Sequence, residues 1–488
     1  MPKYRILKMK KIGFLRAAVA IVLMAIVFVT VFSYTTSPIY KEWGETPDSP
    51  IFQIIGKYWA LGSVPYRDLW DLKGPYIFLI NAIGYWLTGT RLGVYAVQIV
   101  FMSLTLLCFY KMFRTRFQPG QSLTMVAISL LPLSYIYEGG NLTEEYLLPC
   151  LSLSFLFILQ WIDRVENEKR TAHPPLYAFV YGIVAGLSLM SRLTNSLASC
   201  AAVAVIALYL LSCKQYANLC LNIVTFIAGI VFTTLPFLLY FAHYDALDVM
   251  WNTTFLYAAK YAANATKDLA EIGIHYFLLS YFSSILLLAL CVWKTIRRRS
   301  LTVRTCLWFM SALLPFVWFC QGNGFGHYGM TVLPLFAIAF IEIAELRLRT
   351  LAVCIITAMF VACASKVRYM FVIRDRVNDY VSAYTDILES VHGIDYSSFV
   401  AYNCDPNIYL ALDIRPANPF FALQDFAIER NPLLRNDIVS SFRSKRPEWI
   451  LLAKPEDETV NIQPMLDESY TIVATKEGVQ QLILYKKK

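Results

Sequence analysis

Long apolar runs recur along the first three quarters of this 488-residue chain. Many approach the roughly 17–25 residues that an α-helix needs to cross about 30 Å of hydrocarbon. With 57% hydrophobic residues, 16% charged residues and a mean hydropathy of +0.51, the chain is unlike an ordinary soluble protein. We expect an α-helical polytopic membrane protein with about eleven spans. The expected spans lie near Gly13–Ser33, Leu92–Phe113, Leu123–Tyr137, Tyr146–Ile162, Leu176–Leu193, Ser196–Ser212, Ala217–Ala242, Ile274–Trp293, Cys306–Cys320, Tyr328–Ala344 and Leu351–Ala364.

Positive charge predicts the orientation of these spans. The formal net charge is +9, and Lys and Arg concentrate in short loops, as they do on the cytoplasmic side of membrane proteins. The clusters are Lys3–Arg16, Lys111–Arg116, Arg164–Arg170, Lys214, Lys294–Arg304 and Arg347–Arg349. All of them are cytoplasmic only if the short apolar stretch Tyr76–Leu87 does not cross, so we expect an interfacial or re-entrant helix there. The prediction is a multi-pass plasma-membrane protein with a cytoplasmic N-terminus.

The hydropathy falls after the last expected span. We therefore predict a polytopic module over residues 1–373 and a small extracytoplasmic α/β domain over residues 374–488. The expected helices are Asp375–Val391 and Asn431–Phe442, and the expected strands are Ser398–Tyr402, Trp449–Ala453, Tyr470–Ala474 and Leu482–Tyr485. This domain carries no metal-ligand spacing and no nucleophile–base motif, so acceptor recognition or structural cover is its expected role.

A polar and aromatic loop, residues 34–91, follows the first span and is expected on the outer face. Its charged residues between Thr35 and Pro75 include Glu42, Glu45, Asp48, Arg67, Asp68, Asp71 and Lys73, interleaved with Tyr40, Trp43, Tyr58, Trp59, Tyr66 and Trp70. A simple connector does not need this many charges beside this many rings. The composition suits the binding of a polar headgroup, a sugar or a phosphate.

Other polar segments fall on the same expected face. They are the turn Glu138–Tyr146, the hairpin with Arg192 and Asn195, residues 321–328 with His327 and Tyr328, and the stretch Tyr244–Ile272 with Tyr257. Polar residues near membrane level are costly unless they line an aqueous cavity or bind something. Their convergence predicts a functional pocket.

The first loop also resembles a known family. The residues Asp48-Ser-Pro-Ile-Phe52, Pro65-Tyr66-Arg67-Asp68 and Trp70-Asp71-Leu72-Lys73-Gly74-Pro75 resemble the first external loop of bacterial GT-C glycosyltransferases. These polytopic enzymes are related to protein O-mannosyltransferases and to the lipid A aminoarabinose transferase. Glu138–Pro149 resembles their second external loop. The resemblance covers Gly13 to about Ala364 and implies a GT-C-like fold followed by a small outer domain.

The resemblance implies a catalytic base at Asp48. A sugar acceptor hydroxyl is a poor nucleophile, and a carboxylate within hydrogen-bond reach accepts its proton as it attacks. The family usually has an Asp-Glu pair where this chain has Asp48-Ser49, so Glu45 competes for the role. The alternative is that Asp48 only N-caps a helix that starts at Pro50.

Further site residues follow from the resemblance and from their positions. Lys73 matches a family lysine associated with the donor phosphate, and Arg192 is a second candidate for that phosphate. Lys73 could instead be a snorkelling interfacial lysine. Glu144 or Glu145 could hold the acceptor, assist the base, bind a divalent cation with Asp48, or favour a helix N-terminus. The remaining substrate-binding candidates are Arg67, Asp71, Tyr257, His327 and Tyr328, of which the last two could instead anchor an aromatic belt.

The location of the site predicts the donor. Nucleotide sugars are made in the cytoplasm, and the chain has no Gly-rich βαβ fingerprint for a nucleotide. An outer-face enzyme needs a membrane-borne donor, and a polyprenyl-phosphate monosaccharide fits, as the family implies. The acceptor would be a cell-envelope glycan, glycolipid or protein, nucleic acid is not expected, and a single displacement would invert the anomeric carbon. The alternatives are a glycan polymerase or ligase and a lipid-linked sugar transporter or flippase, although no internal repeat favours a transporter.

Overall fold

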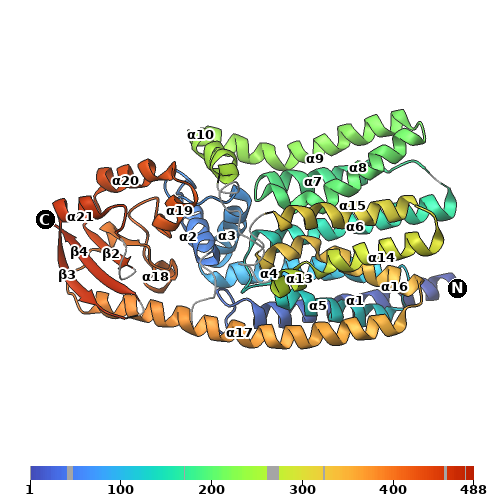
Figure 1. The fold of residues 1–488 in the computed structure, drawn as a ribbon, viewed down its shortest axis with the longest axis horizontal. Helices are drawn as coiled ribbons and strands as arrows, with labels where there is room; N and C mark the ends of the chain where they lie inside the picture. The colour runs from blue at the N-terminus through green and yellow to red at the C-terminus, as the bar shows by residue number, and fades with distance from the viewer. Residues whose placement is uncertain are drawn as a thin grey trace. The chain divides into compact units, whose positions relative to one another are not determined.

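The computed structural model describes residues 2–40, 48–169, 171–260, 274–321, 325–454, 459–478 and 480–488. The chain divides into two compact units (Figure 1). The first unit comprises Met1–Ser33, Tyr95–Phe237 and Lys267–Arg368. The second unit comprises Tyr34–Val94, Leu238–Thr266 and Tyr369–Lys488. The second unit therefore joins the loop after the first span to the C-terminal residues.

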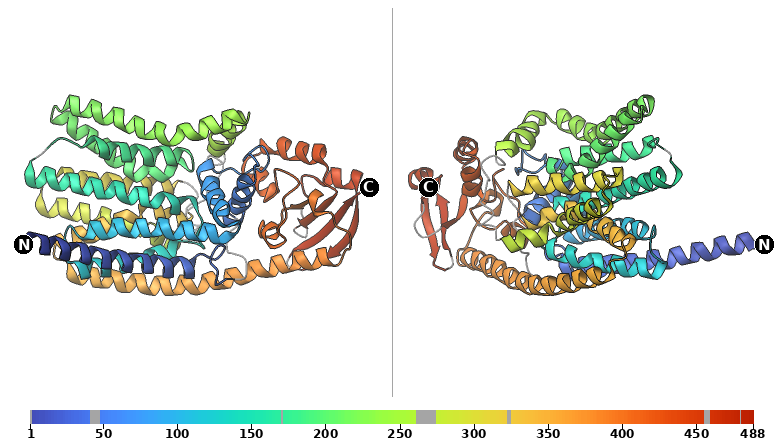
Figure 2. Two further views of the ribbon diagram at one scale, coloured as in Figure 1. Left: turned by 180° about the vertical axis from the view of Figure 1, so that it is seen from behind. Right: turned by 45° about the vertical axis from the view of Figure 1, so that its right-hand side comes forward.

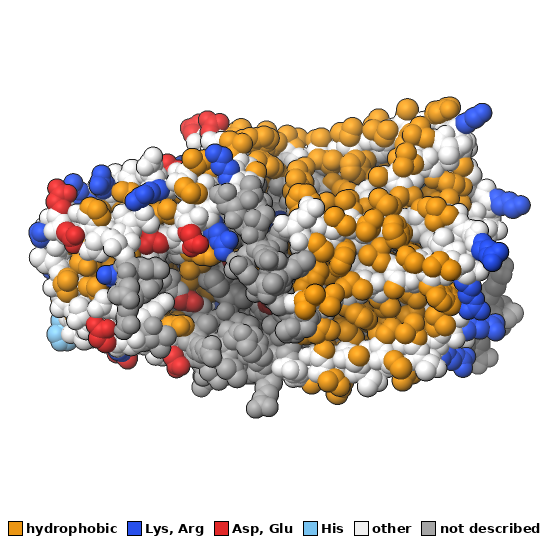
Figure 3. Space-filling model, viewed as in Figure 1, with side chains coloured by type: hydrophobic (Ala, Val, Ile, Leu, Met, Phe, Trp, Pro, Cys, Tyr) orange, Lys and Arg blue, Asp and Glu red, His pale blue; other side chains and the backbone are white. Residues whose placement is uncertain are grey.

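Long apolar helices make up the first unit, and Figure 2 shows them running side by side. Its helices, some of which extend across a unit boundary in the sequence, are α1 (Pro2–Phe32), α4 (Arg91–Phe113), α5 (Pro119–Ile136), α6 (Thr143–Glu168), α7 (Pro175–Leu189), η1 (Leu193–Ser196), α8 (Leu197–Ser212), α9 (Tyr216–His243), α13 (Ile274–Ser280), α14 (Phe282–Arg298), α15 (Val303–Cys320), η3 (Gly326–Val332), α16 (Leu333–Glu345) and α17 (Arg349–Glu389). Figure 3 shows hydrophobic side chains covering the face of this bundle that is in view. The chain is a multi-pass membrane protein.

Seven helical stretches among the described residues are long and apolar enough to cross a membrane. They are Gly13–Phe32, Arg91–Phe113, Thr143–Glu168, Leu193–Ser212, Tyr216–His243, Val303–Cys320 and Gly326–Glu345. Two of the other expected spans form the shorter apolar helices Pro175–Leu189 and Arg349–Ser365. The span expected at Ile274–Trp293 is interrupted at Tyr281, between α13 and α14. The count of eleven spans stays a prediction.

A buried ionic cluster joins α6, α14, α15 and α16 at one end of the first unit. Arg304 is 3% exposed and pairs with Asp163, with Glu166 at 2.7 Å and with Glu342 at 3.3 Å. Lys294 lies 2.5 Å from the other oxygen of Glu342. Buried charges are tolerated only when they are paired in this way, because each has lost its hydration. The cluster therefore specifies how these helices meet.

This cluster also bears on the topology. Arg116, in the loop after α4, pairs with Asp163 at 2.8 Å and with Glu345 at 2.8 Å. Since Asp163 also contacts Arg304, the basic segments near residues 111–116, 164–170, 294–304 and 347–349 meet at one end of the bundle. Figure 3 shows Lys and Arg side chains gathered at that end. The grouping agrees with the loops predicted to share one side, and the cytoplasmic assignment of that side stays a prediction.

Replacing Arg304 with Met should destabilise the first unit by about 1–3 kcal/mol, because buried Glu342 then keeps only Lys294 and Asp163 keeps only Arg116. The effect is measured as thermal unfolding of the purified protein in detergent. The readout is the fraction of protein that remains monodisperse after heating to a series of temperatures. Arg298→Met is the matched control, since Arg298 is exposed at the end of α14. If Arg304→Met and Arg298→Met unfolded at the same temperature, the cluster would have no stabilising role.

In the second unit, α2 (Asp48–Ala60) and α3 (Pro75–Thr88) form a tight helical pair. A Cβ atom at Gly56 would lie 2.4 Å from the Cβ of Asn81, so glycine is what allows this approach. α3 corresponds to the apolar stretch Tyr76–Leu87 and is not among the candidate spans. The expectation that this stretch forms a short helix agrees with the structure. That the helix does not cross the membrane, and that it lies at the interface, stay predictions.

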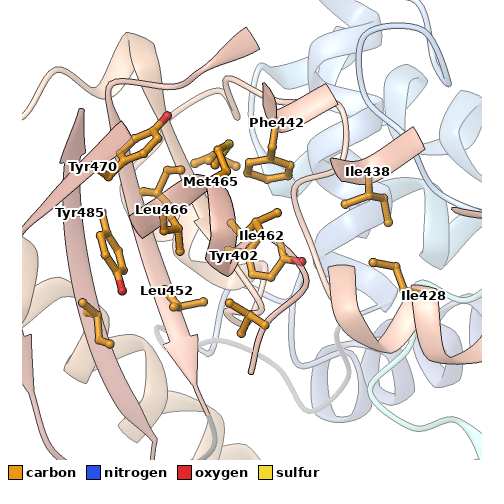
Figure 4. Packing of buried hydrophobic residues seen from close by; sticks show 14 of the residues in the cluster. Tyr402, Ile428, Ile438, Phe442, Leu452, Ile462, Met465, Leu466, Tyr470 and Tyr485 are labelled. Atoms are coloured by element: carbon orange, nitrogen blue, oxygen red, sulfur yellow. The ribbon is translucent and has the colours of Figure 1, made fainter. Parts of the chain in front are cut away.

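The C-terminal residues fold into a small α/β structure within the second unit. A four-stranded sheet has the order β1 (Phe399–Tyr402), β2 (Trp449–Lys454), β4 (Gln481–Lys487) and β3 (Tyr470–Lys476), with β1 and β2 parallel and the other pairs antiparallel. The associated helices are η4 (Tyr396–Ser398), α18 (Asn407–Ala411), α19 (Gln424–Arg430), α20 (Leu434–Lys445) and α21 (Gln463–Ser469). Figure 4 shows Tyr402, Ile438, Phe442 and Leu466 in the core that these elements share. All four predicted strands and the helix predicted near Asn431–Phe442 are confirmed.

The helix predicted over Asp375–Val391 is the C-terminal part of α17, which runs from Arg349 to Glu389 (Figure 1). Residues 375–389 are therefore helical as expected, but the helix begins much earlier than predicted. The change from apolar to polar residues does not end the helix, because no Pro or Gly interrupts residues 349–389. A composition boundary is therefore not a helix boundary here.

The first loop packs on the C-terminal residues within the second unit. The backbone N–H of Trp70 donates to the carbonyl of Pro419 at 2.9 Å, and its ring centroid lies 5.1 Å from that of Phe420. The indole Nε1 of Trp70 donates to Thr253 Oγ1 at 3.1 Å, on the π-helical segment η2 (Asn252–Tyr257) that follows α10 (Leu247–Trp251). Lys57 of α2 pairs with Asp413. The aromatic residues of the loop thus have a structural function beside any binding role.

Candidate functional site

Asp48 and Lys73, the predicted base and phosphate-binding lysine, form an ion pair in the second unit. Lys73 Nζ lies 3.8 Å from Asp48 Oδ2, and their side chains are 26% and 32% exposed. Asp48 lies in the first turn of α2, whose bounds are Asp48–Ala60, and the alternative that it only N-caps this helix stays an alternative. A carboxylate there interacts favourably with the helix dipole, and its remaining exposure leaves room for a ligand.

The loop that carries Lys73 is held by two hydrogen bonds. The backbone N–H of Lys73 donates to Asp71 Oδ1 at 2.9 Å, and Tyr66 Oη donates to the carbonyl of Lys73 at 2.8 Å. Burial, more than the nearby charge of Asp48, raises the pKa of Asp71 to about 6, although Lys73 opposes the shift. Asp71, Asp48 and Lys73 are therefore one electrostatic group, in which Asp71 positions the lysine.

Arg67 and Tyr257, predicted to bind substrate, have structural partners in the second unit. Arg67 donates to both oxygens of Asp68, at 3.0 and 3.2 Å, and to the carbonyl of Tyr244 at 3.3 Å. Tyr257 Oη donates to Asp437 Oδ2 at 3.0 Å. Substrate contact by these two residues stays a prediction. Glu45, the competing base, lies outside the described residues.

In the first unit, Glu144, Arg192 and Tyr328 come together from α6, the segment before η1, and η3. Arg192 Nη1 lies 3.5 Å from Glu144 Oε1, and the guanidinium carbon lies 3.2 Å from the centroid of the Tyr328 ring. The Glu144 side chain is 2% exposed, whereas that of Arg192 is 21% exposed. The ring and the carboxylate orient a planar cation that keeps part of its surface accessible, which suits bidentate contact with a phosphate.

His327 lies beside this group and forms a pair that the sequence reading did not identify. Its Nδ1 lies 2.6 Å from Glu138 Oε2, and its ring stacks on Phe325 with centroids 5.6 Å apart. Glu138 belongs to the turn singled out in the sequence, but 189 residues separate it from His327. Without knowledge of which helices are neighbours, no local pattern could have found the pair.

Glu145 holds the turn that precedes α6. Its carboxylate accepts from Tyr137 Oη at 2.5 Å, from Gln98 Nε2 at 3.0 Å and from the backbone N–H of Asn141 at 2.7 Å. Tyr146 Oη donates to Asn141 Oδ1 at 2.8 Å. These contacts favour a structural function for Glu145 and leave Glu144 as the acidic residue that contacts Arg192.

The predicted divalent cation has no evident cage in the described part of the chain. No group of three or more His, Cys, Asp and Glu side chains there is arranged to hold a metal ion. A metal that used fewer protein ligands together with phosphate oxygens would leave no such group. Metal dependence stays a prediction.

No protein-family model matches the sequence, and no curated protein matches it. Solved structures do. ArnT from Cupriavidus metallidurans bound to undecaprenyl phosphate is similar to this chain with a TM-score of 0.59 and 13% identity, covering 97% of this chain and 98% of that one. The apo state of the same protein is similar with a TM-score of 0.54 and 13% identity, covering 98% of both chains. ArnT is the lipid A aminoarabinose transferase.

The likeness extends over nearly the whole length of both chains, and it includes the helical bundle and the C-terminal α/β residues. The chain therefore has the GT-C fold, as the resemblance of its first loop predicted.

Proposed function

We propose that this protein is an integral membrane glycosyltransferase that moves a sugar from a polyprenyl-phosphate donor to an extracytoplasmic acceptor. The observation that carries the proposal is the whole-length fold likeness to a transferase whose structure contains undecaprenyl phosphate. A fold alone does not establish an activity, so the side chains have to supply the chemistry. The acceptor is a cell-envelope glycan, glycolipid or protein.

The reaction is a single displacement at the anomeric carbon. As the acceptor oxygen forms its bond to that carbon, the bond from carbon to the phosphate oxygen breaks, and polyprenyl phosphate leaves. Asp48 accepts the proton of the acceptor hydroxyl. Its contact with Lys73 at 3.8 Å and its partial exposure support a carboxylate that can accept a hydrogen bond from a ligand. Attack opposite the leaving group inverts the anomeric configuration.

The leaving phosphate gains negative charge in the transition state, and fixed cations stabilise it. Lys73 is the first proposed cation, positioned by Tyr66 and Asp71. Arg192 is the second; its guanidinium carbon lies 3.2 Å from the centroid of the Tyr328 ring, and it pairs with Glu144. Glu144 is the second acidic residue proposed to act, and we assign to it the orientation of Arg192. His327 and Tyr328 are proposed to contact the headgroup.

The test is consumption of a membrane-borne donor. Purified protein in liposomes is incubated with a panel of polyprenyl-phosphate monosaccharides, and release of polyprenyl phosphate is followed by thin-layer chromatography. We expect one donor to be consumed and its sugar to appear on an envelope fraction added as acceptor. Movement of intact donor across the bilayer without cleavage would favour the transporter alternative, and transfer of whole glycan chains would favour the polymerase or ligase.

The rate of transfer should depend on pH through Asp71. Its raised pKa means that the carboxyl ionises only as the pH rises through about 6. The ionised form is the better acceptor for the backbone N–H of Lys73, so it holds the loop that carries the lysine. We expect kcat/KM to fall by about tenfold per unit below pH 6.

In the Asp71→Asn variant, kcat/KM should no longer fall steeply below pH 6, because Asn cannot ionise. Its kcat/KM at neutral pH should also be lower than that of the wild type. The pH–rate profiles of the two proteins, measured between pH 4.5 and 8, test the assignment. If kcat/KM of the Asp71→Asn variant still fell below pH 6 as in the wild type, another group would be responsible for the pH dependence.

A further inference from the structure

A cavity of about 750 Å³ lies within the second unit, apart from the Asp48–Lys73 pair. Its lining includes Asp68 from the first loop, Tyr396 from η4, Arg415 from the segment after α18, and Lys445 from the end of α20. Its volume falls in the range of about 300–1,000 Å³ that is usual for small-molecule sites. The first loop and the C-terminal residues form the cavity together, although nearly 350 residues separate them in the sequence.

The charge of this cavity is unbalanced. The carboxylate of Asp68 accepts from Arg67 at 3.0 and 3.2 Å and from the backbone N–H of Val64 at 2.7 Å. Although burial opposes the shift, these hydrogen bonds lower the pKa of Asp68, so it is ionised and its charge is offset by Arg67. Among the described residues, no carboxylate lies within ion-pair distance of Arg415 or Lys445. Two cations therefore remain available to a ligand.

The two cations also influence each other. Partial burial lowers the pKa of Lys445, the positive charge of Arg415 lowers it further, and Asp68 opposes the shift. An anion bound between them would relieve this repulsion and replace the hydration that Lys445 has lost. Arg415 presents a planar fork that matches a phosphate or a carboxylate.

The rest of the lining suits a sugar. Tyr396 packs its ring against Phe399, with centroids 5.7 Å apart, and it presents both an apolar face and a hydroxyl. Ser397 and Ser398 add hydroxyl groups; Ser398 Oγ accepts from the backbone N–H of Glu448 at 2.9 Å and still carries a proton to donate. A few hydroxyl groups beside an aromatic face and two cations can recognise both parts of an acidic saccharide.

We propose that this cavity binds an anionic saccharide bearing a phosphate or a carboxylate. This binding site goes beyond the proposed transferase function. Arg415 and Lys445 bind the anionic group, and Tyr396 and the two serines contact the sugar ring. The donor phosphate has its own proposed cations, Lys73 and Arg192.

Binding is tested on the full-length protein in nanodiscs, with glucose 6-phosphate, glucose and inorganic phosphate as probes in isothermal titration. Glucose 6-phosphate should bind tighter than either of the others. The double variant Arg415→Gln/Lys445→Gln should weaken its binding by at least about tenfold, because a charge-assisted hydrogen bond is lost at each position. Arg443→Gln, exposed on α20 and outside the cavity lining, is the control and should bind as the wild type does.

Three results would overturn the proposal: no binding of glucose 6-phosphate by the wild type, equal binding of inorganic phosphate, or undiminished binding by the double variant. A second measurement separates this failure from failure of the transferase function. Slow hydrolysis of the donor by water needs no acceptor, so the double variant should retain it. Binding without any donor consumption would instead contradict the transferase function and leave an anionic saccharide site.

Discussion

Replacing Asp48 with Asn is expected to lower the rate of sugar transfer by about 100- to 10,000-fold, the usual contribution of a positioned general base. Asn has nearly the same size and shape as Asp but cannot accept the proton of the acceptor hydroxyl. The change should leave the fold intact, because the Asp48 side chain is 32% exposed and its ion pair with Lys73 is long, at 3.8 Å. A partly exposed pair of this kind contributes little stability.

The measurement is kcat with a polyprenyl-phosphate monosaccharide, with KM for the donor determined separately. A base acts in the chemical step, so kcat should fall while KM changes little. Asp386→Asn is the matched control, because Asp386 is a carboxylate in the same unit, 63% exposed and paired with Lys476 at 2.7 Å. Full transfer by Asp48→Asn would disprove the assignment of the base. If Glu45→Gln then abolished transfer, Glu45 would take the role.

Much of the fold could be predicted because its signals are local. Apolar length identified most of the bundle helices, and short runs rich in apolar residues identified all four strands. The short length of Tyr76–Leu87 predicted the short helix α3. The start of the helix that contains residues 375–389 was missed for an equally local reason, since the change from apolar to polar residues does not end a helix that no Pro or Gly interrupts.

The grouping of the first loop with the C-terminal residues could not be predicted. It depends on contacts such as Trp70 with Phe420 and Lys57 with Asp413, which join positions about 350 residues apart. Composition placed the boundary between membrane and outer domains at residue 373, because it records only the change in hydropathy. The cavity with Arg415 and Lys445 also depends on contacts between the first loop and the C-terminal residues. No sequence pattern within the loop predicts it.

Some residues of the candidate site could be predicted from local motifs, whereas the roles of others depend on tertiary contacts. A local motif ranked Asp48 and Lys73 first in the loop, and the structure pairs them. The roles of Glu144 and Glu145 could not be separated by sequence, because both are acidic residues in the first turn of one helix. Only the tertiary partners distinguish them: Glu145 faces Tyr137 and Gln98, whereas Glu144 faces Arg192.

Arg192→Gln is expected to reduce kcat by about 100- to 1,000-fold, the loss typical when one fixed donor to a developing anion is removed. The kcat of Arg192→Lys should lie between those of the wild type and Arg192→Gln, because lysine retains the positive charge but not the planar guanidinium beside the Tyr328 ring. The loss has two possible origins, since Arg192 also pairs with Glu144, whose side chain is only 2% exposed. Removing the arginine alone leaves that buried carboxylate without its cation.

A double-mutant cycle with Glu144→Gln separates the two origins. If Arg192 binds the donor phosphate, Arg192→Gln should lower kcat by about 100- to 1,000-fold in the wild-type background and again in the Glu144→Gln background. The charge of the substrate is present in both cases. If Arg192 only neutralises Glu144, the cost should vanish once the carboxylate has been replaced by an uncharged amide. The cycle uses kcat and the donor KM of all four proteins, together with their thermal stability. Stability that recovers in the double variant while kcat does not would identify Arg192 as a phosphate-binding residue, independently of its structural partner.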